Sequence, residues 1–126
     1  MTTAVPFLMF QGGDCEAALT FYVGLIPGSC IVSLERNEDG GSVRMAHVVI
    51  ADMEIRANDS TIRHGFNFTP SSSIFLDCTD NDEFERIVAA MAEGGQFLMP
   101  VADYGFSRRF AWLNDRFGVS WQINLP

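Results

Sequence analysis

The chain has 126 residues, of which 48% are hydrophobic and 19% charged, a composition that suits one compact domain and excludes a disordered chain. Its formal net charge is −8, and all eight basic residues are arginine. The acidic balance disfavours nucleic acids and anionic membranes as partners, and the absence of lysine excludes Schiff-base catalysis through a lysine side chain.

Three further features predict a cytoplasmic protein. A membrane-spanning helix needs about 20 apolar residues, and no apolar run in the sequence approaches that length. The N-terminal sequence MTTAVPFLMF lacks the basic start and the long apolar stretch of a secretory signal. Cys15, Cys30 and Cys78 form no CxxC pair and are odd in number, which favours reduced thiols over a disulfide framework.

The first part of the chain predicts a strand, a helix and three more strands. The apolar residues 5–10 are typical of a buried strand. A helix follows, with Asp14 as its expected N-cap and Pro27-Gly28 as its end. Its apolar stripe recurs at helical spacing and comprises Ala17, Ala18, Phe21, Tyr22 and Leu25. Alternating apolar and polar residues then predict strands at 30–35, 43–51 and 53–58.

A polar segment, residues 59–72, separates this part from a second one with the same order of elements. Residues 73–78 predict a strand, and Asp80 begins a helix that ends at Gly94-Gly95. The apolar stripe of this helix comprises Phe84, Ile87, Val88 and Met91. Residues 97–99 predict a short strand, residues 100–105 a loop, and residues 108–114 and 119–125 a closing hairpin.

The two parts match when one is shifted by 66 residues, which places Asp14 on Asp80 and Gly28 on Gly94. Two amphipathic helices can match by chance, but the repeated order of strand and helix favours a duplication. The predicted fold class is therefore α+β, with two βαβββ modules that form a curved mixed sheet, helices outside and a cupped face within. We expect residues 1–126 to form a single domain, with modules at about 1–58 and 73–126 and a linker at about 59–72.

Three stretches of the chain resemble a known family: PFLMFQGGDCEAALTFYVGLIPGS, SIFLDCTDNDEFERIVAAMAEGG and WLNDRFGVSWQINLP. They are similar to the PhnB-like family, also called the 3-demethylubiquinone-9 3-methyltransferase-like domain, of the glyoxalase/bleomycin-resistance (vicinal oxygen chelate) superfamily. The resemblance implies paired βαβββ modules, a homodimer and a small-molecule ligand in the cupped sheet. Methyl transfer from S-adenosylmethionine is not expected, because it commonly uses a doubly wound α/β domain, whereas Gln11-Gly12-Gly13 is only a short turn.

The resemblance also implies where a metal would bind, because metal-dependent members of the superfamily place His, Gln or Glu on four strands of the cup. The corresponding positions here are Phe7, Ser73, Gln122 and, approximately, Glu54. Phenylalanine cannot coordinate a metal, and serine is rarely a principal ligand. We therefore expect no metal and no other cofactor.

Strand alternation places polar side chains on the cupped face, and these are the candidate catalytic residues. We assign Glu54 as acid or base, Arg56 as the partner of an anion or oxyanion, and Gln122 as an orienting amide. His47 is either a general base in the cup or a hydrogen-bonded structural residue. The expected substrate-binding residues are Phe7, Met9, Ser73, Phe75, Phe106 and Trp112.

Three functions remain open at this point. The chain can be an enzyme that acts on a small organic molecule, or a non-catalytic protein that sequesters a small aromatic or cationic compound. It can also be a structural dimer with a vestigial cup. Turnover would identify the enzyme, and ligand-induced thermal stabilisation without product would identify the sequestering protein. The absence of both would identify the structural dimer.

Overall fold

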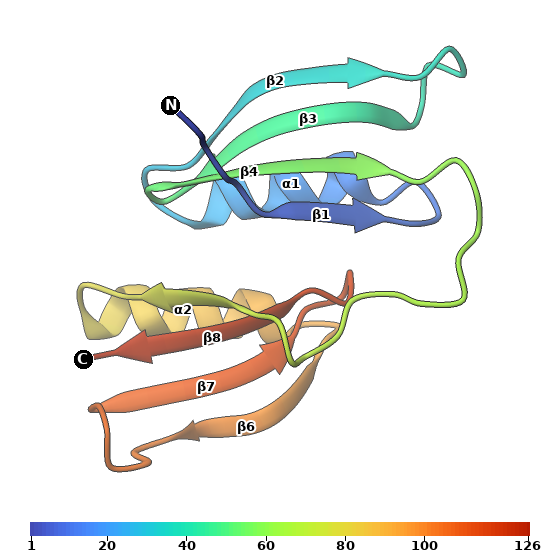
Figure 1. Ribbon diagram of the computed structural model, residues 1–126. Helices are drawn as coiled ribbons and strands as arrows, with labels where there is room; N and C mark the ends of the chain where they lie inside the picture. Colours follow the sequence, from blue (N-terminus) through green and yellow to red (C-terminus); the bar gives the residue numbers. More distant parts are fainter. The chain divides into compact units, whose positions relative to one another are not determined.

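The computed structural model describes residues 1–126 and divides them into two compact units, Met1–Gly65 and Phe66–Pro126 (Figure 1). Each unit contains one helix and one four-stranded sheet in the order βαβββ. The α+β fold class with two βαβββ modules is therefore confirmed, and each module builds its own mixed sheet. Neither helix is long and apolar enough to cross a membrane.

Unit 1 is a four-stranded sheet with one helix against a single face. Its strand order is β1-β4-β3-β2, with β1 parallel to β4 and the other neighbours antiparallel. The helix contacts the three strands that follow it in the chain. The elements are β1 (Phe7–Phe10), α1 (Cys15–Leu25), β2 (Cys30–Arg36), β3 (Val43–Ile50) and β4 (Met53–Asp59).

Unit 2 repeats this connectivity. Its strand order is β5-β8-β7-β6, with β5 parallel to β8 and the other neighbours antiparallel. The helix contacts the two strands that form the closing hairpin. The elements are β5 (Ile74–Asp77), α2 (Asn81–Ala92), β6 (Gln96–Ala102), β7 (Arg109–Asn114) and β8 (Ser120–Leu125).

The expected loop at residues 100–105 is partly wrong, because β6 continues through Pro100 to Ala102. Proline has no backbone N–H, and in a central strand every N–H is needed to pair with one of the two neighbouring strands. Here β6 is the edge strand of its sheet, paired only with β7, and its register with β7 shifts on both sides of Met99. An edge position therefore accommodates the proline that argued for a loop.

Asp14 occupies the N-cap position of α1 as expected, but a residue distant in sequence supplies the capping hydrogen bond. The Asp14 side chain accepts no capping hydrogen bond. Instead the buried carboxylate of Asp59, at the end of β4, accepts a hydrogen bond from the Cys15 backbone N–H at 2.9 Å. The other oxygen of Asp59 accepts from the Val43 N–H at 2.8 Å, so one carboxylate joins the starts of α1 and β3. Asp80, by contrast, caps α2 as expected by accepting from the Glu83 N–H at 2.9 Å.

The buried stripe of α1 is shifted from the expected one. Ala17 is exposed, and Phe21 and Leu25 are only half-buried. The residues that α1 buries are Cys15, Ala18, Leu19 and Tyr22, whereas α2 buries the four expected residues Phe84, Ile87, Val88 and Met91. The two sets have the same spacing at an offset of 69 residues, so the helices match at a different shift from the 66 residues of the sequence comparison.

The strand registers correct the alignment of the modules once more. Phe7 lies opposite Arg56 in unit 1, and Phe75 lies opposite Gln122 in unit 2. Arg56 and Gln122 are related by the 66-residue shift, so the counterpart of Phe7 is Phe75. The sequence comparison placed Phe7 on Ser73 because the chain between the first and the last strand of the module is two residues longer in unit 1 than in unit 2. The duplication is therefore real, but no single shift describes it.

Candidate functional site

The open face of each sheet, meaning the face opposite its helix, carries the candidate site residues. In unit 1 the helix-facing positions of β3 and β4 are buried, among them Val48, Ile55 and Ala57. Side chains on a strand alternate between faces, so the intervening residues lie on the open face. These open-face residues are Met45, His47 and Val49 on β3 and Glu54, Arg56 and Asn58 on β4, with Phe7 and Met9 on β1.

A row of three candidate residues crosses the open face of unit 1. Arg56 is the direct strand partner of Phe7 on one side and of His47 on the other. The Arg56 side chain is exposed and makes no ion pair, whereas Arg36 and Arg44 pair with Glu16 and Glu35. Its guanidinium is therefore available for an anionic group of a ligand.

Glu54 lies beside this row, two residues before Arg56 on the same face of β4. Successive side chains on one face are about 7 Å apart along a strand, so one small molecule can reach both Glu54 and Arg56. Glu54 is exposed and forms no ion pair. A carboxylate, a guanidinium and an imidazole on one face provide groups for proton transfer and anion binding.

Two buried polar atoms on this face lack a partner: His47 Nε2 and Asn58 Oδ1. A buried polar atom without a hydrogen bond costs about 1–3 kcal/mol, so such atoms are uncommon away from binding sites. The structural alternative for His47, a histidine held by hydrogen bonds within its sheet, does not account for the free Nε2. Asn58 was not among the expected site residues; strand alternation, which places it on the same face of β4 as Glu54 and Arg56, is the signal that could have marked it.

An equivalent row crosses the open face of unit 2. Gln122 lies between Phe75 on β5 and Trp112 on β7, as Arg56 lies between Phe7 and His47. Phe75 is exposed, while Gln122 and Trp112 are half-buried. The side-chain amide of Gln122 thus lies between two aromatic residues of neighbouring strands and can orient a bound molecule by donating and accepting hydrogen bonds.

Ser73 and Trp112 belong to a hydrogen-bonded group centred on the buried Ser120. The Trp112 Nε1–H donates to Ser120 Oγ at 2.9 Å, and Ser73 Oγ lies 2.7 Å from the same oxygen. Ser73 Oγ also donates to the Pro70 carbonyl at 3.3 Å. These contacts hold the indole of Trp112 in place and leave its N–H satisfied within the protein.

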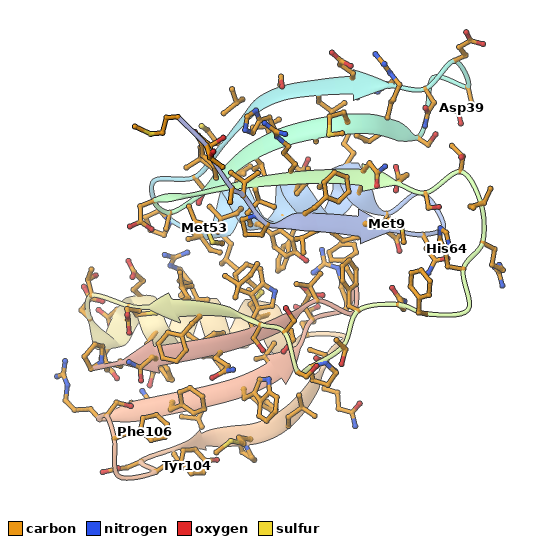
Figure 2. All side chains as sticks on the ribbon, in the orientation of Figure 1. Met9, Asp39, Met53, His64, Tyr104 and Phe106 are labelled. Atoms are coloured by element: carbon orange, nitrogen blue, oxygen red, sulfur yellow. The ribbon has the colours of Figure 1, made fainter.

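Phe106 lies in an aromatic cluster, which we define as Phe75, Tyr104, Phe106 and Phe110. Figure 2 shows Tyr104 and Phe106 close together in the segment between β6 and β7. The rings of Tyr104 and Phe106 are stacked with centroids 6.4 Å apart, and both make T-shaped contacts with Phe110. Phe75 contacts Phe110 at 6.2 Å between centroids, so the cluster joins the loop to the open face of the sheet.

The structure therefore collects the expected site residues into two groups. Glu54, Arg56, His47, Phe7 and Met9 share the open face of unit 1. Gln122, Ser73, Phe75, Trp112 and Phe106 belong to unit 2. The single cup that would bring Glu54 and Gln122 to one ligand stays a prediction.

The side chains present do not fit the metal centre of the metal-dependent superfamily members. The first-strand position is Phe7, and the strand register makes its counterpart a second phenylalanine, Phe75. Aromatic carbon atoms donate no electron pair to a metal.

Two of the three cysteine thiols are poor nucleophiles. Burial, assisted by the charge of Asp59, raises the pKa of Cys15 to about 12. Burial likewise raises the pKa of Cys78 to about 11. Cys30 alone is exposed. Because the thiolate is the reactive form, Cys15 and Cys78 serve as core residues.

Comparison with known proteins identifies the family. The family model described as 3-demethylubiquinone-9 3-methyltransferase matches residues 2–124. The PhnB protein of Bacillus cereus, described as a candidate member of that enzyme class, is 37% identical with a TM-score of 0.93, covering 99% of this chain and 100% of its own. A protein from Pseudomonas aeruginosa is 27% identical with a TM-score of 0.81, covering 99% and 98%.

A glyoxylase/bleomycin resistance protein/dioxygenase domain from Frankia shares the fold at 12% identity, with a TM-score of 0.69 and coverage of 99% and 91%. No curated protein sequence matches the chain. The matched residues extend over nearly the whole sequence, through both βαβββ modules. The chain therefore belongs to the 3-demethylubiquinone-9 3-methyltransferase (PhnB-like) family, and it shares the fold of the glyoxylase/bleomycin resistance domain.

Proposed function

We propose that this protein is an enzyme that acts on a small organic molecule at the open faces of its sheets, without a typical metal centre. The observation that carries the proposal is the row of Phe7, Arg56 and His47, with an unpaired guanidinium beside a free buried imidazole nitrogen. The buried Nε2 has no partner within the protein, and a bound molecule that reaches Arg56 as well would satisfy it.

Each polar group has a distinct role in this proposal. Arg56 binds a negatively charged oxygen of the substrate, and Glu54 donates or removes a proton. His47 acts through Nε2 as a second proton-transfer group. In the equivalent row of unit 2, Gln122 orients a molecule bound on that face between Phe75 and Trp112.

The reaction we propose is not methyl transfer from S-adenosylmethionine, although the family carries that description. The turn between β1 and α1 does contain Gly12 and Gly13, both with positive φ angles. However, the first N–H of the helix after this turn already donates to Asp59, so an internal carboxylate occupies the position where a ligand's anionic group would bind.

A second candidate function is sequestration of an aromatic or cationic compound without chemistry. The aromatic cluster of unit 2 favours it, because Phe75, Tyr104 and Phe106 remain exposed. Exposed aromatic rings provide a large contact area and can bind a cation.

Ligand-induced thermal stabilisation, followed by product analysis, tests both candidates. A compound that raises the melting temperature of the wild-type protein should be converted to product, and Glu54→Gln should lose the conversion while keeping the stabilisation. Arg44→Gln is the matched control, because Arg44 is an exposed strand residue paired with Glu35. Stabilisation without product in the wild type would establish sequestration instead.

Elemental analysis of the purified protein tests the metal-free part of the proposal. We expect less than one equivalent of any transition metal per chain. A stoichiometric transition metal, retained through a chelator wash and lost in Glu54→Gln, would contradict it.

A further inference from the structure

We propose that the open face of unit 2 selects organic cations that donate hydrogen bonds from a planar or aromatic group, with aryl amidines as the chemical prototype. The selectivity presupposes the proposed small-molecule site and adds the class of molecule that unit 2 accepts. Three features of the face support it: unpartnered acceptor atoms, exposed aromatic rings and a surface carboxylate.

The first feature is the orphaned carbonyl oxygen of Asn124. Asn124 is only 8% exposed, and its Nδ2 donates to Asp77 Oδ1 at 2.8 Å. A carboxylate accepts hydrogen bonds but does not donate them, so this contact fixes which end of the amide is nitrogen. Asn124 Oδ1 is therefore an acceptor, and it is buried without a partner.

A second orphaned acceptor lies on the same face. Asn114 Oδ1 is buried without a partner, and Asn114 is the strand neighbour of Ser120, as Phe110 is of Asn124. The Trp112 N–H, a side-chain donor of the same face, is already bonded to Ser120 Oγ. The two buried atoms of the face that lack a partner are thus both acceptors, and a ligand that supplies N–H groups would satisfy them.

The aromatic cluster supplies the second feature, beside these acceptors. Phe75, Tyr104 and Phe106 are 52%, 38% and 60% exposed and surround the buried Phe110, the direct strand partner of Asn124. The Tyr104 hydroxyl donates to the Pro100 carbonyl, which fixes the ring. Such rings attract a cation placed over their faces.

The charged residues of the face also favour a cationic ligand. Asp77 is exposed and is bonded only to a neutral amide, so its negative charge is uncompensated. The basic residues at the start of β7 are engaged elsewhere: Arg108 Nε donates to the Pro126 carbonyl at 2.6 Å, and Arg109 pairs with Glu85 at 2.8 Å. A cation would therefore find the carboxylate of Asp77, while Arg109 is neutralised by Glu85 and Arg108 is held by the Pro126 carbonyl.

Calorimetric titration of the full chain with three related probes tests the proposal. Benzamidinium has the aromatic ring, the charge and the N–H donors; phenyltrimethylammonium lacks the donors; benzoate has the ring with the opposite charge. We expect saturable binding of benzamidinium, with phenyltrimethylammonium weaker by roughly tenfold and benzoate weaker still. Binding of benzoate as tight as that of benzamidinium, or no saturable binding of benzamidinium, would overturn the proposal.

Two variants locate the binding. Asn124→Leu removes the orphaned acceptor with a side chain of similar size, and Asp77→Asn removes the charge at an exposed position that tolerates substitution. Each should weaken benzamidinium by roughly tenfold. Asp82→Asn makes the same charge change at an exposed position on α2 and should leave the affinity unchanged. Equal affinity in Asp77→Asn and Asp82→Asn would refute the assignment to this face.

The outcome separates this inference from the proposed function. A natural compound that stabilises the protein and depends on Arg56, while benzamidinium fails to bind, overturns the cation selectivity and leaves the proposed function intact. Failure of every compound and every probe to bind overturns both.

Discussion

The carboxylate of Asp59 joins the end of β4 to Cys15 at the start of α1, by a hydrogen bond of 2.9 Å to a residue 44 positions earlier in the chain. The same side chain accepts from the Val43 N–H, so two buried backbone donors depend on one residue. Unit 1 thereby fixes its helix against the sheet whose opposite face carries Arg56 and Glu54.

Asp59→Ala should therefore destabilise the protein by about 2–4 kcal/mol, because it leaves two buried N–H groups unsatisfied. Asp14→Ala, at the position adjacent to the helix, should cost less than about 0.5 kcal/mol, because the Asp14 side chain forms no capping bond. Chemical denaturation measures both. Equal losses in the two variants would contradict the long-range cap.

A pair of glycine substitutions tests the packing of the helix ends. A Cβ atom on Gly95 would lie 2.2 Å from the Asn114 carbonyl oxygen, whereas one on Gly24 would meet no atom within 4 Å. Gly95→Ala should destabilise by about 3 kcal/mol, and Gly24→Ala, within α1, should stabilise by about 0.5–1 kcal/mol. The melting temperature should fall in Gly95→Ala and rise in Gly24→Ala. A change of the same sign in both variants would contradict the packing at these two positions.

Thiol labelling should detect one reactive cysteine per native chain. Cys30 is exposed, while Cys15 and Cys78 are buried and have raised pKa values. A thiol reagent at neutral pH should label Cys30 alone, and Cys30→Ser should abolish the fast reaction. Denaturant should expose all three thiols. Fast labelling of two or more thiols in the native protein would contradict the assigned burial.

The raised pKa of Cys15 also predicts a loss of stability in alkali. Burial favours the neutral thiol, so its contribution is fully present below the ordinary pKa of 9.0 and is lost as pH rises toward about 12. The free energy of unfolding should fall more steeply above pH 9.0 in the wild type than in Cys15→Ala. Parallel pH profiles of the two proteins would refute this origin.

The homodimer that the family resemblance implies can be tested by light scattering. We expect a mass of twice 14.0 kDa at micromolar concentration. A monomeric mass would contradict the dimer and leave the ligand proposals standing, because none of them uses residues of a second chain.

Local sequence patterns predicted the elements and the faces of their strands well. Alternation on β4 correctly separated Glu54 and Arg56 from Ile55, because a strand's two faces follow from residue order alone. The sequence also indicated the duplication, since each βαβββ module carries its own strand and helix signals.

Non-local relationships were missed. Asp59 caps a helix 44 residues away, which no local pattern around Asp14 reveals. Pro100 argued for a loop because its tolerance in β6 depends on that strand lying at the edge of the sheet. Phe7 was matched to Ser73 rather than Phe75, because a small length difference between modules is visible only in the strand register. The orphaned oxygen of Asn124 likewise depends on its contact with Asp77, from another strand.

The central claim is that the open faces bind a small organic molecule, and ligand capture from a cell extract tests it most directly. Wild-type protein, Arg56→Ala, Gln122→Ala and the control Arg44→Ala are each incubated with the extract, washed and denatured, and the released compounds are identified by mass spectrometry. We predict a compound retained by the wild type and by Arg44→Ala but depleted in Arg56→Ala or Gln122→Ala. Equal retention by all four proteins, or no retained compound at all, would contradict the claim.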